Sequence, residues 1–128
     1  MSFLLDSHTL LWFISNDSKL SPSGKKILID KNNVCFVSIA SLWEIAIKHS
    51  IKRLELHSGL KEIFQRIKDS EFELLPISTE HILTLSALPH LHKDPFDRIL
   101  IAQAKTEGLA LVTKDQHFSK YDVKVFWN

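Results

Sequence analysis

Short apolar runs alternate with segments of helical character along the whole chain, and this alternation limits the possible folds. Strands are expected at residues 2–5, 34–37, 72–75, 109–113 and 123–127. Helices are expected at residues 8–14, 21–30, 58–68, 79–88 and 95–107, with a further helix capped by Ser38 or Ser41 that ends near Ile47. Strands that alternate with helices predict an α/β fold, a three-layer sandwich with a central parallel sheet flanked by helices.

The length of 128 residues suits one domain over residues 1–128 and is enough to bury a core. Lys and Arg number 16 against 15 Asp and Glu, so the net charge of +1 gives no overall attraction for nucleic acid or anionic membranes. The single cysteine, Cys35, lies in an apolar run, which predicts a buried thiol and fits the cytoplasm. Because no run reaches the roughly 18 apolar residues of a membrane span, neither membrane insertion nor export is expected.

Four acidic residues stand close to the ends of these apolar elements. Asp6 directly follows the first expected strand, and Asp115 lies just beyond the fourth. Asp97 falls in the first turn of a helix, and Glu44 lies about two turns into the helix after the second strand. Sites in open parallel sheets form beyond the carboxyl ends of the strands, where loops and helix N-termini gather. We therefore expect the four carboxylates to meet at this edge.

Carboxylates gathered in this way indicate a metal site. Oxygen ligands suit hard divalent cations such as Mg²⁺ and Mn²⁺, which assist phosphodiester hydrolysis by activating water and neutralising phosphoryl oxygens. A metal ion would also let an acidic cleft accept a phosphate backbone. Like charges held close together should raise the pKa of at least one of the acids. The hydroxyls of Ser7 and Thr113 stand beside two of the acids and could position water or a carboxylate.

Each acid also has an ordinary structural interpretation. Asp94, directly before a proline, is typical of a helix N-cap, and Glu44 fits a capping box with Ser41. Asp6 could cap the helix that follows the first strand, and Asp115 could belong to a turn. The metal-site hypothesis therefore depends on the joint occurrence of the four acids.

Basic and aromatic residues near the acids leave further alternatives open. Basic side chains could steer RNA phosphates or simply be solvated at helix ends; these are Lys48, Lys52, Arg53, Lys93 and Arg98. Trp12 and Trp43 are expected in the core because of their helical spacing, whereas Phe96 could instead pack at an interface or against a partner segment. The pair His90 and His92 is interpreted as surface residues, because a zinc site needs more ligands at suitable spacing.

Four ordered stretches, which together extend over nearly the whole chain, carry a family resemblance: residues 4–12, 41–48, 94–104 and 111–115. They resemble the PIN domain family, in particular the VapC-like toxins of type II toxin–antitoxin pairs. This resemblance implies a PIN-like fold and a Mg²⁺- or Mn²⁺-dependent ribonuclease that is usually a homodimer and is neutralised by an antitoxin whose tail lies over the cleft. The resemblance also implies the site residues: Asp6, Glu44, Asp97 and Asp115 as the acidic quartet, with Asp94 as a secondary contributor.

One residue departs from the family pattern, and two rival enzyme classes lack the motifs that they need. Ser7 stands where such toxins more often carry Thr, a change that keeps the hydroxyl. A phosphoryl-accepting receiver domain needs an acidic pair after the first strand, and a haloacid-type phosphatase needs Asp-x-Asp there; Ser7 and His8 supply neither. A catalytically silent binding or regulatory module with the same fold is the alternative, because a fold alone does not guarantee activity.

Overall fold

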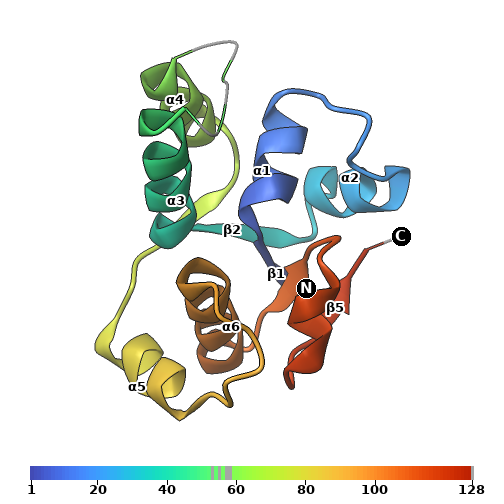
Figure 1. Ribbon diagram of the computed structural model, residues 1–128. Coiled ribbons are helices and arrows are strands. Elements are labelled where there is room, and N and C mark those ends of the chain that lie inside the picture. The colour runs from blue at the N-terminus through green and yellow to red at the C-terminus, as the bar shows by residue number, and fades with distance from the viewer. Residues whose placement is uncertain (53, 55, 57–58, 128) are drawn as a thin grey trace.

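The computed structural model describes residues 1–52, 54, 56 and 59–127 (Figure 1). Each expected strand and helix has a counterpart there, and a short 3-10 helix, η1, is added between the last two strands. In chain order the elements are β1 (Ser2–Leu5), α1 (Ser7–Ile14), α2 (Pro22–Ile29), β2 (Val34–Ser38), α3 (Ile39–Ser50), α4 (Leu60–Asp69), β3 (Glu73–Leu75), α5 (Thr79–Ala87), α6 (Pro95–Glu107), β4 (Ala110–Val112), η1 (Gln116–Lys120) and β5 (Val125–Phe126).

Within the described residues the strands form one five-stranded sheet in the order β3-β2-β1-β4-β5. All neighbouring pairs are parallel. The chain fills the sheet outward from β1 through β2 to β3 and then returns to place β4 and β5 on the other side of β1. Loops after β1 and β4 therefore diverge at the carboxyl edge, which is where open parallel sheets bind ligands.

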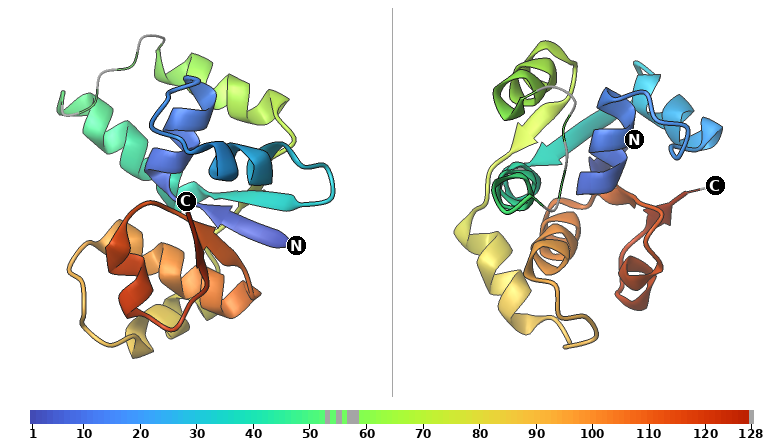
Figure 2. Two further views of the ribbon diagram at one scale, coloured as in Figure 1. Left: turned by 90° about the vertical axis from the view of Figure 1, so that its right-hand side faces the viewer. Right: turned by 45° about the horizontal axis from the view of Figure 1, so that its top comes forward.

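Helices cover both faces of the sheet, and the alternation of side chains along β1 feeds two separate cores. Phe3 and Leu5 join the cluster under α1, α2, α3 and α4. Leu4 joins the cluster formed with α6 and η1 on the opposite face. Figure 2 shows the resulting three layers, with α5 packed on the outside of α6. The prediction of a central parallel sheet flanked by helices is confirmed.

Local capping explains where the helices begin and end. Ser21 caps α2 by accepting a hydrogen bond from the backbone N–H of Gly24. Asp94 caps α6 by accepting hydrogen bonds from the backbone N–H groups of Phe96 and Asp97, and Pro95 occupies the first helical position. Gly108 ends α6 in the left-handed conformation, with φ of 68°. These boundaries agree with the sequence analysis.

Several boundaries differ from expectation. Of the two expected caps Ser38 is the one that starts α3, but this helix continues past Ile47 to Ser50, with Lys48 and His49 in its last turn, where basic side chains are favoured by the helix dipole. Val34 is 40% exposed, so β2 is not covered along its whole length. The expected start of α4 at residue 58 lies outside the described residues. None of the described helices is long and apolar enough to cross a membrane.

Candidate active site

A pocket of about 210 Å³ lies at the carboxyl edge of the sheet, beyond β1 and β4. Its lining comes from segments far apart in the chain: Asp6, Ser7, His8, Glu44, Lys48, His92, Asp94, Asp97, Asp115 and His117. The four acids expected to meet, together with Asp94, therefore share one pocket. The pocket is also lined by three histidines, His8, His92 and His117, that the sequence analysis did not connect with the acids.

Asp6 is buried at the end of β1, and both of its carboxylate oxygens are hydrogen-bonded. Oδ1 accepts from the backbone N–H of Thr9 at 2.8 Å, so Asp6 is the N-cap of α1. Oδ2 accepts from the hydroxyl of Thr113 at 2.5 Å, and the same hydroxyl oxygen accepts from the backbone N–H of Asp115 at 3.0 Å. Thr113 thus ties the end of β4 to the end of β1.

Glu44 is buried on α3, where its carboxylate is held by two side chains. Oε1 accepts from the hydroxyl of Ser7 at 2.6 Å, and Oε2 lies 2.7 Å from the ammonium of Lys48. The capping-box alternative for Glu44 is wrong, because α3 begins at Ile39, two residues before Ser41, and is capped by Ser38. Ser7 acts on Glu44 and not on the neighbouring Asp6, a pairing of residues distant in sequence.

Asp94 and Asp97 occupy the start of α6. Asp94 is the N-cap, since Oδ1 accepts from the backbone N–H groups of Phe96 and Asp97. The carboxylate of Asp97 accepts a hydrogen bond at Oδ2 from Nε2 of His92, at 2.8 Å. The pKa of Asp97 is raised to about 6: burial is the largest cause, the charges of Asp94 and Glu44 add to the rise, and the hydrogen bond and charge of His92 oppose it. The expected rise in the pKa of one acid is confirmed, with burial as its largest cause.

Asp115 follows β4 and starts η1. Its Oδ1 accepts from the backbone N–H of His117 at 2.9 Å and from the ring Nδ1 at 2.7 Å. Burial alone would raise the pKa of Asp115, but these hydrogen bonds and the nearby histidines outweigh burial and hold the pKa below its ordinary value. Asp97 and Asp115 therefore have pKa values displaced in opposite directions within one pocket.

The basic residues near the acids divide into two groups. Lys48 lines the pocket; burial lowers its pKa, but Glu44, Asp94 and Asp97 together raise it above the ordinary value. Arg98 is buried and donates to the backbone carbonyl of Pro89 and to the hydroxyl of Tyr121, so its suggested contact with RNA is wrong. Two others, Lys52 and Lys93, are exposed, and Arg53 lies outside the described residues.

The aromatic and histidine expectations are met only in part. Trp12 packs against the core as expected, but Trp43 is 59% exposed, so its assignment to the core is wrong. Trp43 turns outward from α3 and meets Phe96 edge-on, with ring centroids 5.2 Å apart. His90 is exposed, whereas His92 is half-buried in the pocket, which corrects its interpretation as a surface residue. Helical periodicity could not reveal this, since both changes depend on contacts between distant segments.

The carboxylates of the pocket suit a hard divalent cation, because Mg²⁺ and Mn²⁺ prefer oxygen ligands. Three carboxylate oxygens have no hydrogen bond within the described part of the chain: Oδ2 of Asp94, Oδ1 of Asp97 and Oδ2 of Asp115. As they are placed, no group of three or more described His, Cys, Asp or Glu residues is arranged to hold a metal ion. The donor chemistry therefore fits such an ion, while internal hydrogen bonds set the present positions of the side chains.

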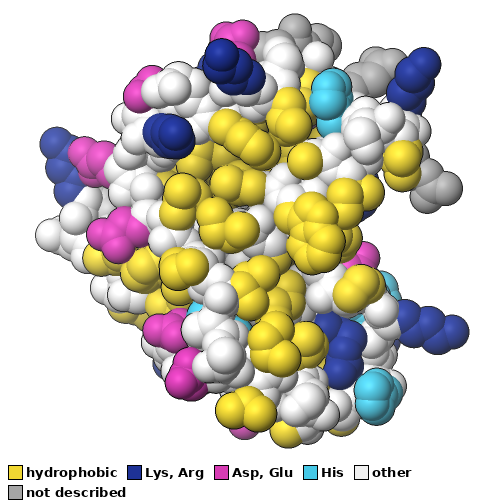
Figure 3. All heavy atoms as spheres, turned by 90° about the vertical axis from the view of Figure 1, so that its left-hand side faces the viewer, with side chains coloured by type: hydrophobic (Ala, Val, Ile, Leu, Met, Phe, Trp, Pro, Cys, Tyr) yellow, Lys and Arg dark blue, Asp and Glu magenta, His cyan; other side chains and the backbone are white. Residues whose placement is uncertain are grey.

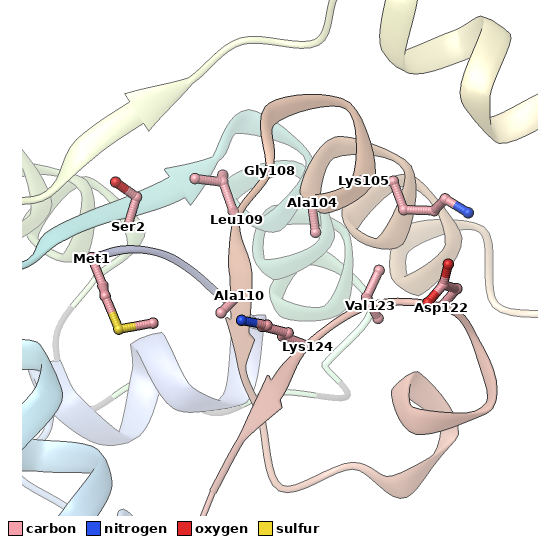
Figure 4. Close-up of a pocket in the computed structure, with 10 residues that line it drawn as sticks. All are labelled: Met1, Ser2, Ala104, Lys105, Gly108, Leu109, Ala110, Asp122, Val123 and Lys124. Atoms are coloured by element: carbon pink, nitrogen blue, oxygen red, sulfur yellow. The ribbon is translucent and has the colours of Figure 1, made fainter.

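A second, larger pocket of about 490 Å³ lies at the opposite edge of the sheet (Figure 4). It is lined by the beginnings of β1 and β4, at Ser2 and Ala110, and by Lys105, Asp122 and Lys124, among others. None of the acids considered above reaches it. Because parallel sheets bind ligands at their carboxyl edge, the smaller acidic pocket is the candidate active site.

A parallel sheet ordered in this way, with acids from β1, α3, α6 and the loop after β4 in one pocket, defines a class of nuclease-like α/β domain. The chain belongs to the PIN domain family, whose model matches residues 3–124. The family resemblance seen in the sequence is confirmed.

Particular relatives can also be named. The chain is similar to "Ribonuclease VapC22" of Mycobacterium tuberculosis, with 27% identity over 119 residues, which cover 92% of this chain and 90% of that protein. Among solved structures it resembles VapBC2 from Rickettsia felis bound to a promoter DNA fragment, with a TM-score of 0.75, 18% identity and 98% of each chain covered. It also resembles DNA-bound VapBC from Salmonella typhimurium, with a TM-score of 0.70, 16% identity and coverage of 98% and 97%.

Proposed function

We propose that this chain, residues 1–128, is a single-domain, divalent-metal-dependent endoribonuclease that acts as the toxin of a type II toxin–antitoxin pair. The observation that carries the proposal is the convergence of Asp6, Glu44, Asp97 and Asp115, from four different elements, in one pocket. Buried like charges are costly, so a fold that gathers them needs a compensating cation. The similarity to a ribonuclease of the VapC type supports RNA as the substrate.

In this proposal Asp6, Glu44, Asp97 and Asp115 hold Mg²⁺ or Mn²⁺, with Asp94 as a secondary contributor. A divalent ion bound there would stabilise charge on a phosphoryl oxygen and make water easier to deprotonate. The chain's own residues fix the carboxylates: Thr113 holds Asp6, and Ser7 and Lys48 hold Glu44. With a net charge of only +1, the chain depends on Lys48 and on the ion to admit a phosphate backbone.

The proposed partners are a cognate antitoxin and a second copy of the chain. Solved relatives include a toxin–antitoxin complex and a member of the VapBC family of toxin–antitoxin systems, which supports an antitoxin partner. Figure 3 shows hydrophobic side chains gathered on the face that lies to the left in Figure 1, where α3, α4 and α5 are found. These and neighbouring segments carry several exposed large apolar residues: Ile39, Trp43, Leu74, Ile77, Ile82 and Leu83. An apolar face of this kind supports a homodimer. A toxin that cuts cellular RNA would act in the cytoplasm.

The deciding experiment is cleavage of structured RNA by the purified chain with Mn²⁺, with Mg²⁺ and with chelator, beside Asp6→Asn. The expected result is cutting that needs the metal and is lost in the variant. Asn can still cap α1, so loss of cutting would not report unfolding, and a thermal melt verifies this. Metal-independent cutting, or full activity of the variant, would refute the site assignment.

A catalytically silent PIN-fold binding module is the second candidate. It is favoured by the absence of an arranged group of three metal-binding side chains among the described residues. Mn²⁺ titration separates the two: a silent module would bind no ion in the pocket and cut no RNA.

The partner proposals have separate tests. Expression of the chain alone should slow growth, and the product of a neighbouring short gene should form a complex with it and restore growth. Light scattering should give the mass of a dimer, and Trp43→Glu should reduce it to that of a monomer. Normal growth without any complex would refute the antitoxin proposal, and a monomeric mass for the unchanged chain would refute the dimer.

A further inference from the structure

Two imidazole rings stack beside the acids of the pocket. The ring of His92, in the loop between α5 and α6, lies on the ring of His117, in η1, with centroids 4.4 Å apart and planes inclined by 19°. Each ring also reaches a different acid: Nε2 of His92 lies 2.8 Å from Oδ2 of Asp97, and Nδ1 of His117 lies 2.7 Å from Oδ1 of Asp115. The stack therefore joins two acids that belong to separate segments.

A buried network holds the segments that carry the two rings. The guanidinium of Arg98 donates to the carbonyl of Pro89 at 2.8 Å and to the hydroxyl of Tyr121 at 3.0 Å. The same hydroxyl accepts from the backbone N–H of Leu91 at 3.2 Å. Tyr121 immediately follows η1, so one hydroxyl links the loop before α6 to the segment after β4. Both histidines are thus presented from fixed backbone.

The hydrogen bonds restrict the two carboxylates in a defined way. An ionised carboxylate only accepts hydrogen bonds, so each ring nitrogen must be the donor. One oxygen of Asp97 and one of Asp115 is engaged by its ring, and the second oxygen of each has no hydrogen bond in the part of the chain that the structure describes. Because the nitrogens that touch the acids are occupied as donors, they are not available as metal ligands.

We propose that His92 and His117 are positioning residues for the metal site: the stacked pair holds Asp97 and Asp115 so that the second oxygen of each is presented to the ion. This inference rests on the proposed function, since it assumes that the two acids bind a divalent cation. Groups that orient metal ligands by hydrogen bonds commonly contribute about 10- to 100-fold to metal affinity.

The test is Mn²⁺ affinity of the purified full chain, measured by calorimetry and by the electron paramagnetic resonance signal of free Mn²⁺. His92→Phe keeps a ring for stacking but removes the donor, whereas His92→Gln keeps a donor near the position of Nε2. His117→Phe and His117→Asn form the same matched pair, because the Asn amide nitrogen replaces Nδ1. His90→Phe, in the same loop but exposed, is the control.

The expected result is affinity about 10- to 100-fold weaker in both Phe variants, within about threefold of the unchanged chain in His92→Gln and His117→Asn, and unaltered in His90→Phe. Phe variants that bind Mn²⁺ as tightly as the unchanged chain would overturn the inference and leave the proposed function standing. Equal losses in the Phe and amide variants would also overturn it, since the donor would not be what matters. An unchanged chain that binds no Mn²⁺ would refute the proposed function itself. His117 is half-exposed, so its variants decide the question even if those of His92 fail to fold.

Discussion

The ammonium of Lys48 lies 2.7 Å from Oε2 of Glu44, one turn earlier on α3. The carboxylate is almost fully buried, whereas the lysine side chain is 39% exposed, so the pair bridges the protein interior and solvent. Lys48 is also close enough to Asp94 and Asp97 for both charges to raise its pKa. It is therefore the local counter-charge of the acidic pocket.

Lys48→Met should destabilise the fold by about 1–2 kcal/mol, because it leaves the charge of Glu44 buried with Ser7 as its remaining partner. Urea unfolding at pH 7.5 measures the change. Arg66→Met is the matched control: Arg66 pairs with Glu62 at the same helical spacing and 3.2 Å, but both side chains are at least half exposed. This control should change stability by no more than about 0.5 kcal/mol. Equal losses of stability in Lys48→Met and Arg66→Met would show that the burial of Glu44 does not cause the loss in Lys48→Met.

Ser7→Ala should destabilise the chain by about 1–2 kcal/mol, because it removes a 2.6 Å hydrogen bond to a buried carboxylate. Ser7→Thr should retain most of the stability, since the hydroxyl remains. Ser41→Ala serves as the control: its hydroxyl is buried and has no partner among the described residues, so the change should be neutral or stabilising. Thermal melts of the three variants provide the comparison, and a neutral Ser7→Ala would count against the assigned bond.

Asp97→Asn should stabilise the chain near pH 7.5 and lose that advantage at lower pH. The pKa of Asp97 is about 6 in the folded chain, above its ordinary value of 3.8, so the folded state binds the proton more tightly. Its contribution to stability is thus present below pH 4 and declines as pH rises toward 6. With chelator present, the variant should melt about 2–6 °C higher than the unchanged chain at pH 7.5, corresponding to roughly 1 kcal/mol. A difference that grows as pH falls would contradict the raised pKa.

Thr113→Val should reduce RNA cleavage more than 10-fold, because a ligand held by one fewer hydrogen bond is less well oriented. The hydroxyl of Thr113 donates to Asp6 and accepts from the backbone of Asp115. Thr9→Val is the control: its buried hydroxyl donates to the carbonyl of Val112 and touches none of the acids. Both variants should lose stability, and only Thr113→Val should lose cleavage. Similar cleavage by the two would assign Thr113 to stability alone.

The sequence was sufficient for the elements of the fold and for the edge at which the acids lie. Periodicity, the caps Ser21 and Asp94, and the stop at Gly108 are properties of neighbouring residues, so they can be read locally. Asp6 directly follows β1 and Asp115 closely follows β4, and parallel strands bring their carboxyl ends to one edge of the sheet. Whether the four acids bind a metal ion stays a prediction.

Only the tertiary structure decided which side chain meets which. Ser7 is next to Asp6 in the chain but bonds to Glu44, 37 positions away. Arg98 follows Asp97 yet is buried against the loop that carries Pro89, while Trp43 stands on a helix face that packing leaves exposed. His92 and His117 stack because the loop before α6 and the segment after β4 are tied together through Tyr121. Local patterns specify where an element begins and ends and which residues share one of its faces. Which face is covered, and which side chains meet across elements, depends on how closely packed layers fit together.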